Sequence, residues 1–208
     1  MTEVLLVSGS LRAESVNSAV LRTAAALAGD RIRTTLYEGL GTLPHFNPDD
    51  DPDGGPVSAP VADLRRRLAD ADAVLFCTPE YAGSLPGSFK NLLDWTVGGD
   101  ETYGKPVAWT NASSRPDPDA GSGAHAAQCT VLGYTGPADI AAAACRRIRV
   151  PRTAVGANGV VTDAAIRDEV AMALRTLADY AARPRNVRGS MSGDVPDVRS
   201  ARRADDGR

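Results

Sequence analysis

Residues 8–18, SGSLRAESVNS, combine closely spaced hydroxyl groups with small side chains, directly after an apolar run and before a segment of helical periodicity. The first N–H groups of a helix have no partner within the helix, and the helix macrodipole favours an anion beside them. Ser10, Ser15 and Asn17 can add side-chain donors there, and Arg12 can add a positive charge. We therefore expect this segment to bind the phosphate of a mononucleotide. In the alternative, Ser15 only caps the helix and the other hydroxyls belong to a turn.

Two phosphate-binding patterns of other nucleotide sites do not occur in the chain. These are G-x-G-x-x-G, which binds dinucleotides, and G-x-x-x-x-G-K-[ST], which binds nucleoside triphosphates. A phosphate monoester is the class of ligand that remains.

A second candidate segment, TPEYAGSLPGSFKNLLDW at residues 78–95, follows the apolar run AVLFC. Pro79 and Pro86 restrict its backbone, and Gly83 lets a flat ligand approach the backbone closely. Tyr81 offers an aromatic edge to the same ligand. The apolar residues that end the segment are expected to pack the core or a subunit contact.

The elements that must position these segments alternate between strand and helix patterns. Strands are expected at residues 3–7, 31–37, 73–78 and 106–110, and helices at residues 15–27, 61–71, 87–96 and 163–182. Weaker patterns predict helices at residues 124–133 and 140–147, and a short last strand within residues 149–155. The alternation predicts an α/β protein, a three-layer sandwich with a five-stranded parallel sheet in the flavodoxin-like order 2-1-3-4-5.

In such a sheet, ligands bind outside the carboxyl ends of the strands, near the point where the strand order reverses. Both candidate segments follow strand ends, and so does a third loop at residues 111–123. Residues 1–183 are expected to form one domain. Residues 184–208 alternate Arg, Asp, Gly, Ser and Pro with little to bury, so we expect a disordered tail there.

Composition limits the partners of the chain. A net charge of -3 and a pI near 5.4 disfavour a nucleic-acid partner, and no apolar run approaches the roughly 18 residues of a membrane span. The start of the chain lacks the cationic region of a signal peptide, which predicts a cytoplasmic protein. Cys77, Cys129 and Cys145 are widely spaced among apolar neighbours and are expected to be buried free thiols. Neither His45 nor His125 lies in a metal-binding pattern, so no metal site is expected.

Two motifs together resemble the NADPH-dependent FMN reductase family. These are G-S-L-R-x-x-S-x-N at residues 9–17 and P-E-Y-x-x-S-x-P-G-x-x-K-N-x-x-D-W at residues 79–95, and the order of elements agrees over roughly residues 3–182. The resemblance implies a flavodoxin-like fold that holds FMN non-covalently and takes hydride from NADPH or NADH. The electrons then pass to a small-molecule acceptor such as a quinone, an azo compound, a metal oxyanion or a flavin. It also implies a homodimer or homotetramer, and no side chain is required as an acid or base because the cofactor carries the chemistry.

The resemblance also assigns residues to the cofactor. The residues implied for the FMN phosphate are Ser10, Arg12, Ser15, Asn17 and Ser18. Those implied for the isoalloxazine ring are Pro79, Glu80, Tyr81, Ala82 and Gly83, and the third loop adds Ser113 and Ser114 as further hydroxyls. In many members the helix after the second segment builds the subunit interface, which would involve Lys90, Asn91, Asp94 and Trp95.

Some of these assignments have alternatives. Glu80 could be structural and bond to the first loop, and Trp95 could belong to the core. Many relatives carry Asn where this chain has Ala82, and the third loop contains an acidic, proline-containing insertion where relatives have a compact turn. Two other functions stay open. One is a flavodoxin-type electron carrier, against which the mild net charge argues, and the other is an interaction module that has lost the flavin.

Overall fold

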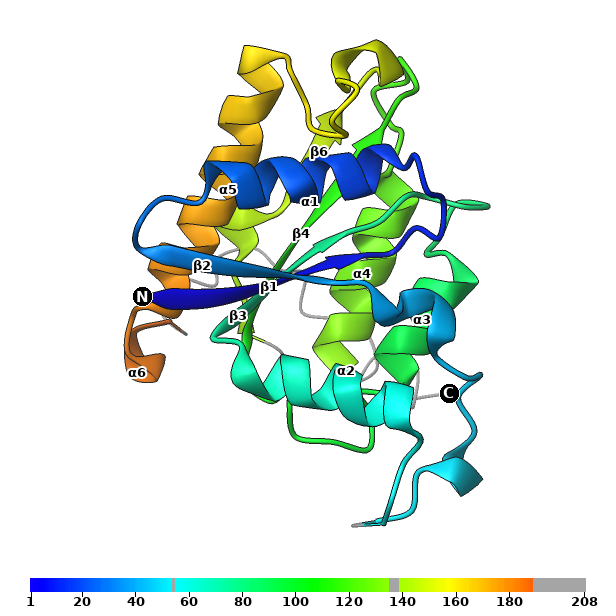
Figure 1. The fold of residues 1–208 in the computed structure, drawn as a ribbon. Helices are drawn as coiled ribbons and strands as arrows, with labels where there is room; N and C mark the ends of the chain where they lie inside the picture. The colour runs from blue at the N-terminus through cyan, green and yellow to red at the C-terminus, as the bar shows by residue number, and fades with distance from the viewer. Residues whose placement is uncertain (54, 135–138, 189–208) are drawn as a thin grey trace, which may run out of the picture.

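The computed structural model describes residues 1–53, 55–134 and 139–188, which form a parallel β-sheet between two layers of helices (Figure 1). The strands are β1 (Thr2–Ser8), β2 (Ile32–Tyr37), β3 (Ala73–Cys77), β4 (Pro106–Ser113), β5 (Asp139–Ile140) and β6 (Arg146–Arg149). Their order is β2-β1-β3-β4-β5, and β6 also pairs with β4. This result confirms the predicted flavodoxin-like order, with the reversal between β1 and β3.

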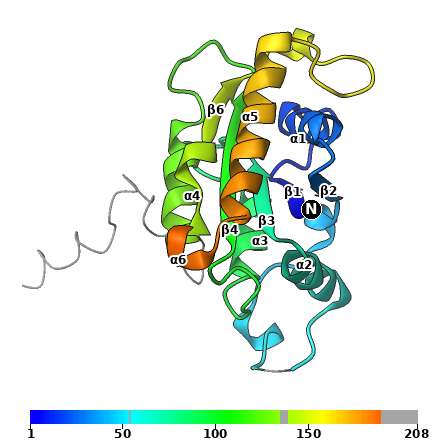
Figure 2. The ribbon, with the colours of Figure 1, turned by 90° about the vertical axis from the view of Figure 1, so that its left-hand side faces the viewer.

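The helices cover both faces of the sheet. They are α1 (Val16–Leu27), α2 (Ala59–Asp70), α3 (Gly87–Asp94), α4 (Ser122–Tyr134), α5 (Ala164–Ala181) and the short α6 (Arg185–Arg188). One buried cluster joins the sheet to α1 and α5, which Figure 2 shows side by side, and a second cluster joins it to α2, α3 and α4. In the part of the chain that is described, no helix has both the length and the apolar character needed to cross a membrane.

Alternation within β1 explains how one strand serves both clusters. Val4 and Leu6 pack with α1 and α5, whereas Leu5 and Val7 pack with the helices on the other face. Successive side chains of a strand point to opposite faces, so a strand covered on both sides must be apolar throughout. Each buried aliphatic side chain of this kind contributes about 1.5–3 kcal/mol. The continuous apolar runs in the sequence are thus buried central strands.

Two short strands, β5 and β6, share the fifth position in the sheet, beside β4. Two predictions for this region were wrong. Residues 140–147 were predicted as a helix, but β5 pairs with the start of β4, a 3-10 helix (Ala142–Ala144) follows, and β6 pairs with the end of β4. The predicted last strand within residues 149–155 lies earlier, at β6. Ala141, Ala144 and Ile148 are buried against the sheet, so strand pairing and burial outweighed the helix propensity of the alanines.

The long connection between β2 and α2 is tied down by polar contacts rather than left free. The carbonyl oxygen of Pro44 accepts hydrogen bonds from the Asn91 side chain at 2.8 Å and from Trp95 Nε1 at 2.9 Å. The Arg65 guanidinium also pairs with Asp51 at 2.8 Å, and both side chains are largely buried. The side chains of Asn91 and Trp95 therefore form contacts within this chain. Trp95 is buried in the core, which confirms the prediction of a core position for it.

The first residues of the expected tail contact the end of α5. Residues 185–188 form α6, where the Arg188 guanidinium donates to the carbonyl oxygens of Ala181 and Arg183, and the Tyr180 hydroxyl donates to the Arg188 carbonyl. The rest of the predicted tail, residues 189–208, lies outside the described residues.

Candidate functional site

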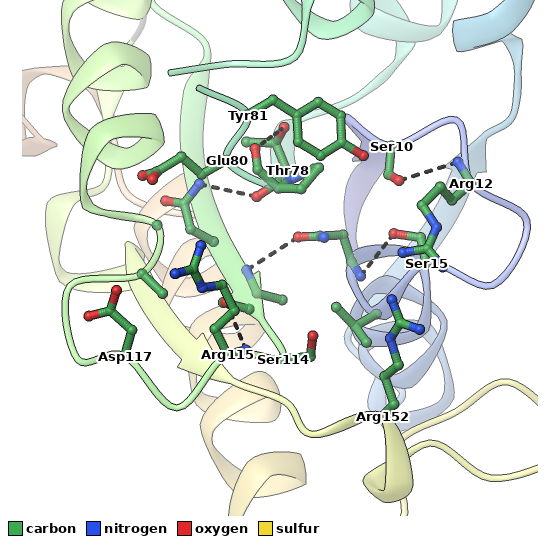
Figure 3. Close-up of a pocket in the computed structure, with 18 of the residues that line it drawn as sticks. Ser10, Arg12, Ser15, Thr78, Glu80, Tyr81, Ser114, Arg115, Asp117 and Arg152 are labelled. Atoms are coloured by element: carbon green, nitrogen blue, oxygen red, sulfur yellow. Dashed lines mark hydrogen bonds between the residues drawn. The ribbon is translucent and has the colours of Figure 1, made fainter. Parts of the chain in front are cut away.

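A pocket of about 200 Å³ opens at the carboxyl ends of β1, β3 and β4, where ligands were expected (Figure 3). The loops after these strands line it, and a segment that follows β6 adds Arg152. β4 runs three residues further than predicted, to Ser113, so the third loop begins at Ser114. The reversal of strand order between β1 and β3 separates the loops enough to leave this space.

The α1 end of the pocket is rich in donors and positive charge. Ser15 caps α1, its hydroxyl accepting a hydrogen bond from the Asn17 backbone N–H at 3.2 Å, and Ser10 and Arg12 lie in the preceding loop. Figure 3 shows the guanidiniums of Arg12 and Arg152 approaching the space beside Ser15 from two sides. Within the described part of the chain, neither guanidinium forms an ion pair or a hydrogen bond. This end of the pocket therefore suits an anion.

Asn17 and Ser18 have contacts that the sequence did not predict. The buried Asn17 side-chain oxygen accepts hydrogen bonds from the Ala112 N–H at 3.2 Å and from Cys77 Sγ at 3.3 Å, so it joins α1 to two strands. The Ser18 hydroxyl pairs with that of Ser8 at 2.9 Å. Asn17 still lines the pocket, whereas Ser18 does not. Both residues hold the first loop in place.

The second loop ends in a tight turn. Tyr81 and Ser84 exchange two backbone hydrogen bonds of 3.0 Å, and between them Ala82 has a φ of 51° and Gly83 a φ of 73°. Two central residues with positive φ define a type I′ turn, for which Asn-Gly is the favoured sequence. Pro79, Glu80 and Tyr81 line the pocket. Ala82 and Gly83 form the exposed tip of the turn and do not line the pocket.

Glu80 has a structural partner, but a different one from the first loop. Its Oε2 accepts hydrogen bonds from the backbone N–H groups of Gly123, at 2.7 Å, and Ala124, at 3.1 Å, at the start of α4. Gly123 is needed at this contact because a Cβ on it would lie 2.1 Å from the Gly83 carbonyl oxygen. The carboxylate thus fastens the second loop to the third, and the helix dipole favours its charge.

The acidic insertion folds into the end of the pocket away from Ser15, as the position of Asp117 in Figure 3 shows. Asp117 Oδ1 accepts a hydrogen bond from the Asp119 N–H at 2.9 Å, and Arg147 donates to the Pro118 carbonyl at 3.1 Å. Ser113 lines the pocket, and its hydroxyl accepts a hydrogen bond from a backbone N–H of the same loop. The end away from Ser15 therefore carries both signs of charge, with Arg115 beside Asp117 (Figure 3).

The pocket also contains residues that sequence reasoning missed. Arg152 lies far along the chain from either motif, and no local pattern marks it. Asn111 lines the pocket and donates to Gln128 Oε1 at 3.0 Å, while its own buried side-chain oxygen has no partner among the described residues. A ligand or a water molecule can satisfy that acceptor.

Two titratable groups near the site, Cys77 and His125, are held neutral. Burial raises the pKa of the Cys77 thiol to about 12, so it carries no thiolate. Burial, and then the nearby charge of Arg147, lowers the pKa of His125. Its Nδ1 accepts a hydrogen bond from Trp109 Nε1 at 2.9 Å, which fixes the neutral form. In residues 1–53, 55–134 and 139–188, no cluster of side chains suited to a metal ion is found.

Comparison with known proteins adds an independent line of evidence. The family model described as NADPH-dependent FMN reductase matches residues 2–143. An NAD(P)H-dependent FMN reductase of Pseudomonas aeruginosa is 40% identical over 114 residues, which cover 54% of this chain and 60% of that protein. A quinone reductase of Pseudomonas putida is 38% identical over 107 residues, covering 51% of this chain and 54% of the relative. The chain thus spans only a little over half the length of these curated relatives.

A solved structure agrees over more of the chain. FerB, a flavoenzyme NAD(P)H:(acceptor) oxidoreductase from Paracoccus denitrificans, superposes with a TM-score of 0.68 at 27% sequence identity. The superposition covers 87% of this chain and 97% of the other. The agreement therefore extends beyond the region matched in sequence.

Proposed function

Because the chain belongs to the NADPH-dependent FMN reductase family, we propose that it binds FMN in the pocket and uses NADPH or NADH to reduce a small acceptor. The acceptor class we favour is a quinone, which the name of the Pseudomonas putida relative supports. Azo compounds, metal oxyanions and free flavins remain further candidates.

The observation that carries this proposal is the division of the pocket into two chemically distinct ends. FMN has a dianionic phosphate at one end and a flat ring system at the other. The α1 end offers Ser10, Ser15, Arg12 and Arg152 beside a helix N-terminus, which is the donor set that a phosphate requires. The rigid stretch from Pro79 to Tyr81, which lines the same pocket, supports a flat group. The residues present therefore fit FMN.

Of the residues assigned from the resemblance, we propose direct phosphate contacts for Ser10, Arg12 and Ser15. We propose that Asn17 and Ser18 act mainly by holding the loop, because their side-chain oxygens have partners within the protein. Ser113 is suited to the polar chain between phosphate and ring, since it lines the pocket at the end of β4.

At the ring end we propose contacts from Pro79, Glu80 and Tyr81, whose backbone or side chain lines the pocket. Ala82 and Gly83 would act by shaping the turn. The backbone N–H of Tyr81 is bonded to Ser84, so it is not free to stabilise charge on a ring. Glu80 would position the loop, since both of its contacts are to α4.

FMN held here would supply the redox chemistry, the transfer of a hydride's two electrons and proton from a nicotinamide to an acceptor. The contribution of the protein is to position the reactants. A hydride donor held about 3–3.5 Å from the accepting atom has already lost most of the translational and rotational entropy that the reaction requires. Arg12 and Arg152 hold the phosphate, and the Glu80 contact with α4 keeps the second and third loops at a fixed separation. Glu80 is not placed as an isolated general base, since its Oε2 already accepts two backbone hydrogen bonds.

We also propose a homodimer or homotetramer in the cytoplasm. Exposed Val97 and Tyr103 follow α3, and burial of these side chains would favour a subunit contact there. The cysteines of the chain are free thiols, which suits a reducing compartment. Light scattering on the purified protein tests the oligomeric state.

The experiment for the main proposal is the absorption spectrum of the purified protein with FMN, before and after anaerobic NADPH, and then after a quinone. We expect bound yellow flavin that bleaches with NADPH and recovers with the quinone. Protein that never binds FMN is an interaction module instead. Protein whose flavin is bleached only by a partner reductase is an electron carrier.

A second measurement tests the phosphate end. Arg12→Ala should raise the Kd for FMN by about tenfold or more while leaving the Kd for riboflavin nearly unchanged, because only FMN has the phosphate that the guanidinium binds. Arg175→Gln, an exposed change on α5 away from the pocket, is the matched control for charge. Equal losses for both flavins would remove Arg12 from the phosphate site.

A further inference from the structure

Three arginines lie beside the third-loop side of the pocket: Arg115 in the loop itself, and Arg147 and Arg149 on β6. Across the parallel strands β4 and β6, Asn111 pairs in register with Arg147, and Ser113 with Arg149. Asn111 and Ser113 both line the pocket, so the two β6 residues lie on the strand next to its wall. Among the described strands, β6 pairs with β4 alone, at an edge of the sheet (Figure 2). We call Arg115, Arg147 and Arg149 the basic surface.

The alternation of β6 directs its two members of the basic surface to the α4 side of the sheet. Ile148 packs in the cluster with α1 and α5, and Arg146, on the same face as Ile148, contacts α5. Successive side chains of a strand point to opposite faces, so Arg147 and Arg149 lie on the other face, with α4 and the third loop. The hydrogen bond from Arg147 Nη1 to the Pro118 carbonyl agrees with this direction.

The positive charge of the basic surface is not paired with carboxylates. Within residues 1–53, 55–134 and 139–188, none of its three guanidiniums forms an ion pair, and the Arg149 side chain donates no hydrogen bond. Asp117 and Asp119 lie in the same loop as Arg115, but Asp117 accepts a hydrogen bond from the Asp119 N–H instead. Three guanidiniums at the mouth of a pocket, in a chain of net charge -3, indicate an anionic ligand.

Of the molecules in the proposed reaction, the nicotinamide donor suits this place best. The FMN phosphate is bound beside Ser15 by Arg12 and Arg152 in the proposed site, away from β6. A simple quinone is smaller than the flavin ring and does not extend beyond the third loop. A nicotinamide dinucleotide is longer, because only its nicotinamide must reach the flavin ring for hydride transfer. Its diphosphate and adenosine therefore continue outside the pocket, where a basic surface can meet them.

We propose that the basic surface binds the phosphates of the nicotinamide donor. This inference rests on the proposed function and adds a site for the donor to it. A guanidinium suits a phosphate because its planar N–H groups match two phosphate oxygens. Arg115 lines the pocket and Arg149 lies beyond it, so the two follow the path of the donor outwards. Two groups share this chemistry, the diphosphate of both donors and the 2′-phosphate of NADPH alone.

The test uses Arg115→Gln and Arg149→Gln in protein loaded with FMN. We expect each variant to raise the Kd of NADP⁺, measured by calorimetry, by about three- to tenfold, and to raise the KM for NADPH with kcat unchanged. The Kd of FMN should stay within about twofold. Added salt should weaken NADP⁺ binding more in the unaltered protein than in the variants, because the variants have fewer charges to screen. Arg146→Gln, on the same strand but the opposite face, is the matched control.

Three ligands separate the two phosphate groups. Nicotinamide riboside has no phosphate, NAD⁺ has the diphosphate, and NADP⁺ has the 2′-phosphate as well. Equal losses for NAD⁺ and NADP⁺ assign the diphosphate to the basic surface, and a loss for NADP⁺ alone assigns the 2′-phosphate.

The proposal is overturned by an equal loss for nicotinamide riboside, by a parallel loss of FMN, or by losses no larger than in Arg146→Gln. If NADPH does not bleach the flavin of the unaltered protein, the proposed function itself is contradicted.

Discussion

Ala82 occupies a backbone conformation that suits another residue better. Its φ of 51° lies in the left-handed region, where an L-residue with a Cβ is strained by roughly 1–2 kcal/mol and Asn is tolerated more easily. Ala82→Asn creates the Asn-Gly pair favoured in a type I′ turn. We therefore expect the free energy of unfolding to rise by about 0.5–1 kcal/mol, because part of the strain is relieved. For a chain of this size, this corresponds to a melting temperature about 1–4 °C higher.

Thermal melting of three variants tests this reasoning. Ala82→Val should lower the melting temperature, since a β-branched side chain is disfavoured at positive φ. Ala182→Asn is the matched control, because Ala182 is exposed and ends α5 with a right-handed φ of -70°. If Asn raises stability equally at both positions, or Val at position 82 has no cost, the turn is not strained as described. FMN affinity should change little in Ala82→Asn, since this residue does not line the pocket.

Three further perturbations test the contacts around the third loop. Glu80→Gln keeps an acceptor for the N–H groups of α4 and should lower the free energy of unfolding by about 0.5–1 kcal/mol. Glu80→Ala leaves these N–H groups without that acceptor and should lower it by about 1–3 kcal/mol. Urea denaturation measures both changes. Gly123→Ala should weaken FMN binding and stability together, because its Cβ would lie 2.1 Å from the Gly83 carbonyl oxygen; an unchanged flavin titration would refute this. The lowered pKa of His125 means that the unfolded chain takes up its proton first as the pH falls below about 6.5, so stability should decrease from there down to the folded pKa and then level off. His125→Gln, which keeps an acceptor for Trp109, should flatten this decrease in urea midpoints measured between pH 7.5 and 5.

Local patterns in the sequence were sufficient for most of the fold. Apolar runs marked the central strands because burial on both faces requires apolar residues at every position. The cap residues Ser15 and Asp163 marked the starts of α1 and α5, since each side chain bonds to a backbone N–H of its own helix. Such features depend on neighbours a few residues away, so the sequence carries them directly. The pattern failed at residues 140–147, where pairing with β4 decided the conformation.

The same distinction holds within the site. The sequence by itself determined that a hydroxyl-rich segment and a proline-containing segment follow two neighbouring strands. This was enough to expect a phosphate and a flat ring there. Only the tertiary structure decided that Glu80 fastens its loop to α4, that Asn17 holds two strands, and that Arg152 lies beside Ser15. Each of these depends on residues from 43 to about 140 positions apart brought together by packing. No local periodicity records such distances, because the sheet order and the path of the connections set them.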